Sequence, residues 1–107
     1  MKQRITIKDK SQLTEKQKEK YTKFCKKHEY GEFINKNPNS YRCELLTIGQ
    51  LVELLYEKKA LHNYHAIDGC YEQRGNGWHV VLKGKDTYTI EEDELCDGLW
   101  KAVKAVL

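Results

Sequence analysis

The 107-residue sequence lacks any long apolar run. A membrane-spanning helix needs about 20 consecutive apolar residues, and no stretch of this chain approaches that length. The first ten residues, MKQRITIKDK, also lack the apolar segment of a secretory signal peptide. We therefore expect a cytoplasmic protein with no membrane partner.

The sequence also lacks a Cys-x-x-Cys pair, because its cysteines Cys25, Cys43, Cys70 and Cys96 are widely spaced. In a reducing compartment such cysteines are free thiols that pack as small hydrophobic side chains. Four cysteines would also fit two disulfides in a secreted protein, but the missing signal peptide argues against that. The expectation is four free thiols.

A recognisable catalytic motif is missing too. Cys70 with His65 or His79 could join a nucleophile to a base, but neither an oxyanion-hole motif nor an orienting acid accompanies them. Residues 74–77 (RGNG) could hold an anion through backbone N–H groups, yet they lack the Gly-Lys-Ser/Thr ending of a nucleotide-binding loop. The glycines of a hairpin loop explain this stretch better. We expect no enzymatic activity and no cofactor.

One pair of residues has metal-ligand spacing. Cys25 and His28 stand three residues apart, and Cys43 could add a third zinc ligand. Tyr21 and Phe24 share their helical face, however, which favours packing in a core. The other spacings match no zinc module, so no metal site is predicted.

The apolar residues that are present predict three antiparallel strands flanked by two helices. The first helix begins after Thr47, whose spacing from Gln50 is that of a capping box. Its buried stripe is Ile48, Leu51, Val52 and Leu55, with Leu54 beside it. The strands are expected over residues 63–72, 78–83 and 87–90, with a bulge at residues 68–69, a Gly-rich loop at residues 74–77 and a tight hairpin at residues 83–86. In the middle strand Trp78, Val80 and Leu82 alternate with His79, Val81 and Lys83.

The last helix is expected to begin near Glu91. Thr89 and Glu92 have capping-box spacing, and residues 91–94 (EEDE) would fill the first turn with carboxylates. The buried stripe is then Leu95, Leu99, Ala102, Val103 and Val106. Trp100 lies at the margin of that stripe, so a homo-oligomer is expected if this margin is exposed. The fold class is α+β with the order α-β-β-β-α.

A basic segment precedes this domain. Residues 4–8 alternate as a short strand would, and a helix should run from the cap Thr14 to about His28 or Tyr30, ending at Gly31. Residues 32–43 read as a connector with a turn at residues 37–40. Residues 1–43 hold twelve Lys and Arg against five Asp and Glu, a balance of +7, whereas residues 44–107 have a balance of −4. We predict a basic arm (1–43) and a compact domain (44–107); the arm could bind a polyanion or dock on the domain.

Several segments resemble the double-stranded RNA-binding domain: residues 51–55 (LVELL), Tyr64, residues 78–82 (WHVVL) and residues 101–107 (KAVKAVL). The resemblance implies the α-β-β-β-α fold over residues 47–107. That family binds phosphates through lysines at the start of its last helix, where this chain has Glu91, Glu92, Asp93 and Glu94. Carboxylates there would repel RNA, so the resemblance does not carry over that binding mode.

Residues 94–107 (ELCDGLWKAVKAVL) also resemble the end of small α-β-α sandwich proteins from phages. This resemblance implies a small non-enzymatic binding protein of the phage or mobile-element type. Together with the small size and the missing catalytic motif, it predicts an inhibitor of a host defence protein complex or a sequesterer of the nucleotide signal of such a complex, in the host cell cytoplasm.

The outer face and rim of the strands hold the candidate contact residues, which combine aromatic rings, hydrogen-bond donors and cations suited to a nucleotide or a protein interface. These are His65, Tyr71, Arg74, His79 and Lys83. The alternative is a nucleic-acid-binding module in the basic arm, with Lys16, Lys20, Lys23 and Lys27 on phosphates.

Overall fold

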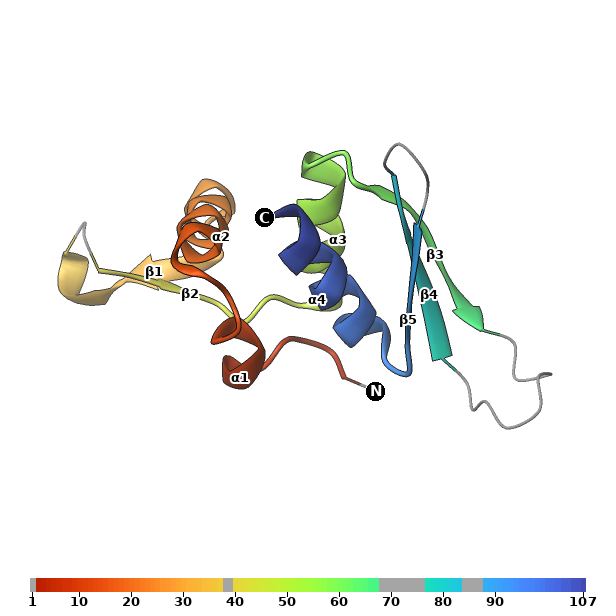
Figure 1. The fold of residues 1–107 in the computed structure, drawn as a ribbon. Helices are drawn as coiled ribbons and strands as arrows, with labels where there is room; N and C mark the ends of the chain where they lie inside the picture. The colour runs from red at the N-terminus through yellow and green to blue at the C-terminus, as the bar shows by residue number, and fades with distance from the viewer. Residues whose placement is uncertain (1, 38–39, 68–76, 84–87) are drawn as a thin grey trace.

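The computed structural model describes residues 2–37, 40–67, 77–83 and 88–107, with residues 65–67 and 88 described by their backbone alone. The fold is α+β, as predicted (Figure 1). Its elements in chain order are α1 (Ile7–Lys10), α2 (Glu15–His28), β1 (Gly31–Phe33), the 3-10 helix η1 (Ile34–Lys36), β2 (Tyr41–Cys43), α3 (Ile48–Glu57), β3 (Leu61–Ile67), β4 (Gly77–Leu82), β5 (Tyr88–Glu92) and α4 (Leu95–Val106).

The strands β3, β4 and β5 form an antiparallel meander with β4 in the middle. Helix α4 packs on β4 and β5, and α3 packs on α4 and β3, so both helices lie on one side of the sheet (Figure 1). Val80 and Leu82 face these helices and are buried, which confirms the predicted alternation of β4. No described element covers the opposite face, which we call the open face (Asn63, His79, Val81, Thr89 and Glu91).

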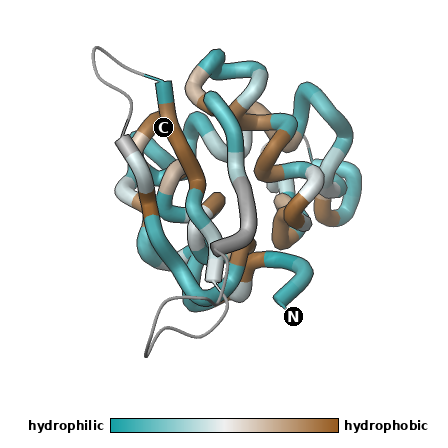
Figure 2. Tube along the Cα trace, turned by 90° about the vertical axis from the view of Figure 1, so that its right-hand side faces the viewer, coloured by the Kyte–Doolittle hydropathy of each residue, from teal (hydrophilic) through white to brown (hydrophobic). Residues whose placement is uncertain are grey.

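Figure 2 looks at the meander from the side away from α3 and α4, and the apolar colour concentrates there on the middle strand.

The sheet starts and ends differently from the expectation. β3 begins at Leu61, two residues early, and its irregular register lies between Leu61 and Asn63. The bulge expected at residues 68–69 and the turn expected near residues 84–86 lie outside the described residues.

The core unites residues from both ends of the chain. Leu51, Leu54 and Leu55 of α3 and Leu95, Leu99, Ala102 and Val103 of α4 are buried as their helical periods predict. Trp100, expected at the margin of the α4 stripe, is buried, with an exposed fraction of 2%. Its ring meets Tyr21 of α2 edge-on, with 6.1 Å between the ring centroids. The predicted homo-oligomer therefore loses the exposed margin on which it depended.

Two capping boxes are confirmed. The amide of Gln17 donates to the Thr14 hydroxyl at 3.2 Å, and the Gln17 side chain accepts from the Thr14 amide at 2.9 Å. Thr47 and Gln50 make the same pair of bonds at the start of α3. Each box satisfies two amides that a helix start leaves without partners. These helices therefore begin where local sequence directs.

The start of α4 corrects the prediction. Helix α4 begins at Leu95, its N-cap Glu94 makes no side-chain capping bond, and Glu91 and Glu92 are the last residues of β5. Glu91 pairs with His79 and Glu92 pairs with Trp78 of β4. Their backbone groups therefore belong to the sheet and are not available for a capping box. The first turn of α4 holds one carboxylate, Asp97, rather than four. It still holds no lysine cluster of the RNA-binding kind.

The N-terminal strand expected over residues 4–8 is wrong. Thr6 and Asp9 form a third capping box, which begins the short helix α1 at Ile7. Arg4 makes a single antiparallel bridge to Thr47. Ile5 is buried, whereas Ile7 is 77% exposed, so the two do not share a face. The capping bonds outcompete a strand that, among the described residues, has no neighbour beyond this bridge.

The connector expected over residues 32–43 is in fact a β-hairpin. Helix α2 ends at His28, and Glu29 adopts a left-handed conformation. Glu29 therefore ends the helix, a role that was expected of Gly31. Gly31 opens β1 opposite Cys43. A Cβ atom at residue 31 would lie 2.2 Å from the carbonyl oxygen of Arg42, which only glycine permits. The turn at residues 37–40 is described only in part, since residues 38–39 lie outside the described ranges.

The predicted boundary near residue 43 stays a prediction. Side chains before it bind backbone carbonyls after it, since Gln17 donates to the carbonyl of Lys104 at 2.8 Å and the Tyr21 hydroxyl donates to that of Glu44 at 2.7 Å. Within the described ranges, no helix is long and apolar enough to span a membrane.

We predict that Gly98→Val destabilises the protein by about 1–3 kcal/mol, because the close contact of α4 with β4 leaves no room for a larger side chain. A Cβ atom at Gly98 would lie 3.0 Å from Cγ2 of Val80. Urea unfolding measures the change. The matched control is Gly49→Val in α3, where the nearest atom to an added Cβ is 4.0 Å away. Equal stability of the two variants would contradict tight packing at Gly98.

Candidate functional site

The residues predicted on the sheet are only partly brought together. Tyr71 and Arg74 lie outside the described residues, and His65 is described by its backbone alone, opposite His79. Nε2 of His79 lies 3.5 Å from a carboxylate oxygen of Glu91, so an acidic neighbour accompanies it on the open face. Lys83 follows β4 with an exposed side chain. In the described region this face presents little positive charge.

The lysines predicted on α2 do lie together. Lys16, Lys20, Lys23 and Lys27 follow one another at intervals of four, three and four residues, and all are exposed. We call these four residues the lysine face. It exists because α2 buries a different stripe, formed by Tyr21, Phe24 and Cys25. Every other direction of the helix is left to polar side chains.

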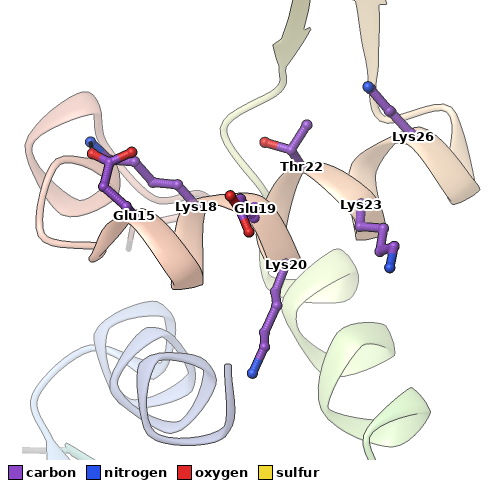
Figure 3. A pocket seen from close by; sticks show the side chains of 7 residues that line it. All are labelled: Glu15, Lys18, Glu19, Lys20, Thr22, Lys23 and Lys26. Atoms are coloured by element: carbon purple, nitrogen blue, oxygen red, sulfur yellow. Dashed lines mark ion pairs between the residues drawn. The ribbon is translucent and has the colours of Figure 1, made fainter.

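Three members of the lysine face, Lys16, Lys20 and Lys23, make no ion pair with a described residue. Beside them the surface is hollowed between four lysines (18, 20, 23 and 26) and two glutamates (15 and 19) of α2 (Figure 3). In Figure 3 Lys20 and Lys23 point to one side of the helix, away from Thr22. A second hollow lies between α2 and the end of α3 and is lined by Lys20, Lys23, Phe24, Lys27, Glu57 and Lys58. Cations thus border both hollows.

The fourth member, Lys27, is held by α3. Its ammonium pairs with Glu57, and His28 lies 2.9 Å from an oxygen of Glu53 and 3.4 Å from one of Glu57. The Tyr30 hydroxyl donates to Glu53 at 2.6 Å. Hydrogen bonds from Lys27 and His28 lower the pKa of Glu57, against the opposing effect of burial. This network joins the end of α2 to α3 and neutralises Lys27.

Lys26 belongs to the same turn but points elsewhere. Its Nζ lies 5.9 Å from the ring centroid of Phe33 and 5.7 Å from that of Tyr41. Both rings come from the β1–β2 hairpin. An ammonium over an aromatic face is attracted by the electrons of the ring. The cluster links α2 to the hairpin.

The three described cysteines, Cys25, Cys43 and Cys96, are buried free thiols, in agreement with the prediction for them; Cys70 lies outside the described residues. A hydrogen bond between the side chains of Cys25 and Cys43 lowers the pKa of Cys43 to about 6 and raises that of Cys25. Sγ of Cys43 also lies 3.6 Å from the hydroxyl oxygen of Thr22. The two thiols thus lie side by side where β2 packs on α2.

The structure does not bring the candidate zinc ligands Cys25, His28 and Cys43 together as one site. His28 faces Glu53 and Glu57 rather than the two thiols, and its ring packs on Phe24 and Tyr30. Across the described parts of the chain no group of three or more His, Cys, Asp or Glu side chains could hold a metal ion.

Comparison with models of protein families, with curated proteins and with solved structures found no match to this chain. Its function must therefore be inferred from the arrangement of its own residues.

We predict that Glu57→Gln removes a stabilising contribution of less than about 1 kcal/mol at pH 7, since the pair with Lys27 is largely exposed. The lowered pKa of folded Glu57 gives a contribution that is present above its unfolded pKa and lost as the pH falls through the folded pKa. Urea unfolding at pH 7 and pH 3 should show a difference from the parent protein that shrinks in acid. A difference that grows in acid would contradict this pairing.

Proposed function

We propose that this protein is a small, non-enzymatic nucleic-acid-binding module that contacts phosphates through α2. The observation that carries the proposal is the lysine face, in which Lys16, Lys20 and Lys23 are exposed, aligned and without an ion-pair partner among the described residues. Phosphate contacts from lysine and arginine supply most of the non-specific affinity for nucleic acids. Lys58 at the neighbouring hollow adds to the same field.

The length of the lysine face suits a polymer rather than a single anion. Lys23, the last unpaired member, follows Lys16 by seven positions, which corresponds to about 10 Å along a helix. That distance spans several consecutive phosphates, which follow one another at about 3.4 Å along the axis of each duplex strand. Both hollows are open at the surface and are lined mainly by charged side chains. A small ligand usually occupies a more apolar and more enclosed site.

Charge also separates this helix from the rest of the molecule. Residues 1–43 have a balance of +7, and residues 44–107 a balance of −4. A polyanion is therefore attracted to the side that carries α2 and repelled from the acidic side. This asymmetry supports one orientation of the bound strand.

The test removes the three unpaired lysines. We predict that Lys16→Gln/Lys20→Gln/Lys23→Gln weakens binding of a 16-nucleotide oligonucleotide at least tenfold at low salt. For a single strand it should reduce the slope of log K against log salt concentration by about 2, because three phosphate contacts are lost. Fluorescence anisotropy of a labelled oligonucleotide measures both quantities.

The matched control is Lys8→Gln/Lys83→Gln/Lys101→Gln, which changes the net charge equally but leaves α2 intact. It should keep at least half of the parent affinity. Equal losses in the two triple variants would contradict a site on α2, and salt-independent binding would contradict phosphate contacts.

A second candidate is supported by the open face of the sheet. Both packed helices lie on the other side, and Val81 is only partly covered between the exposed residues Asn63 and Thr89. On this surface the protein would bind a host defence protein, or its nucleotide signal, as an inhibitor of the phage type.

If the open face binds a nucleotide, His79→Ala and Lys83→Ala should each weaken that binding at least fivefold, because each removes a polar contact. Isothermal titration with mono-, di- and cyclic nucleotides measures this. The triple glutamine variant of α2 should leave the affinity unchanged. Loss of nucleotide binding in that variant alone would assign the nucleotide to the lysine face instead.

A further inference from the structure

The β1–β2 hairpin carries a half-exposed aromatic pair. Phe33 and Tyr41 are register partners, and their rings meet edge-on with 5.0 Å between centroids. On the same side of the hairpin Cys43 is buried beneath α2 with 7% exposure, whereas Phe33 is 49% exposed. The hairpin in Figure 1 extends beyond the end of α2, away from the meander. Its apolar side therefore passes from core to surface at Phe33.

Contacts with α2 hold this pair in place. The Tyr41 hydroxyl donates to the carbonyl of Cys25 at 3.2 Å, which fixes the ring beside the last turn of the helix. Lys26, in that turn, lies over both rings. The ring of Phe33 is thus presented by a fixed partner rather than by a loose loop.

The aromatic pair continues the cationic surface of α2. Lys26 lies one turn after Lys23, and both line the hollow shown in Figure 3. In Figure 3 Lys23 and Lys26 leave the helix on different sides, and Lys26 is the one that lies over the ring of Phe33, so a phosphate on Lys26 would place a neighbouring base near that ring. Glu32 and Arg42 are register partners on the opposite side of the hairpin and carry opposite charges.

We propose that the ligand of this surface is a single-stranded nucleic acid, with a base stacked on Phe33 and its flanking phosphates on Lys23 and Lys26. This inference rests on the proposed function and names its substrate class. Single strands are bound by aromatic platforms beside cationic grooves, because every base has a face that can stack. Bases inside a duplex are already stacked, so a duplex could use the lysines but not the ring. An acidic protein would use the lysines without needing a flat ring.

The experiment compares three ligands with Phe33→Ala and with Phe33→Leu, which keeps an apolar side chain but removes the ring. The ligands are a 16-nucleotide oligothymidine, the same oligonucleotide with abasic sites throughout, and a 16-base-pair duplex. Fluorescence anisotropy at one low salt concentration gives each affinity. The control is Tyr56→Ala, which removes a 60% exposed aromatic side chain from α3, outside the hairpin.

Both Phe33 variants should bind oligothymidine about five- to 100-fold more weakly than the parent protein, as expected for the loss of one stacked base. Their affinities for the abasic strand and the duplex should stay within twofold of the parent values, as should every affinity of Tyr56→Ala. Circular dichroism should show an unchanged fold, since Phe33 is half exposed.

The two proposals fail differently. If the Phe33 variants bind oligothymidine like the parent protein while the triple glutamine variant of α2 does not, stacking is overturned and the phosphate surface stands. If Phe33→Ala weakens duplex and abasic strand as much as oligothymidine, the ring acts on the fold and not on a base, which also overturns stacking. If the parent protein binds none of the three ligands, the proposed function fails, and an acidic protein partner becomes the better occupant.

Discussion

The narrow apolar stripe of α2 is the constraint on which the arrangement depends. This helix has three buried residues, Tyr21, Phe24 and Cys25, and charged or polar side chains almost everywhere else. It can pack on the rest of the protein in only one orientation. In that orientation the Tyr21 ring meets Trp100 edge-on, and the Tyr21 hydroxyl donates to the carbonyl of Glu44. Burial of one aromatic side chain contributes on the order of 2–3 kcal/mol, so rotation of the helix away from this orientation is strongly disfavoured. The lysine face and the aromatic pair of the hairpin follow from that one orientation.

The charge of the N-terminal part serves two different purposes. Lys2 lies 2.7 Å from Asp9 and 2.5 Å from Asp97, and Lys27 pairs with Glu57, so some cations fasten the first 30 residues to the rest of the chain. Burial opposes the charge of Lys2, but hydrogen bonds to both carboxylates outweigh it and raise its pKa. Lys16, Lys20 and Lys23 have no such partner among the described residues. The +7 balance of residues 1–43 thus combines lysines in internal contacts with exposed lysines that make no ion pair with a described residue.

The features that could be predicted from the sequence are those that depend on residues close together in the chain. The capping boxes at Thr14 and Thr47 use residues three apart, and the lysine face needs only the helical period. The start of α4 could not be predicted in this way, because Glu91 and Glu92 are claimed by pairing with β4. The β1–β2 hairpin escaped prediction because its strands have three residues each, too few to show alternation.

The contacts that complete the candidate site are also distant in the chain. Lys26 and Tyr41 are brought together only by the packing of the hairpin on α2, and no local spacing signals it. The burial of Trp100 likewise depends on Tyr21, which lies far from it in the chain. Sequence alone therefore indicated the lysines that we propose as phosphate contacts and missed the ring beside them. Of the residues predicted on the sheet, His79 and Lys83 are the two whose side chains are described, and neither lies beside this surface.

Amide chemical-shift mapping by NMR tests the central claim most directly, because it reports on α2, the hairpin and the meander in one titration. With a short single-stranded oligonucleotide as ligand, the largest shifts are predicted at residues 16–27 and 31–43, with smaller shifts along β4 and β5. Shifts concentrated on the open face of the meander, with α2 unchanged, would contradict the placement of the binding surface on α2.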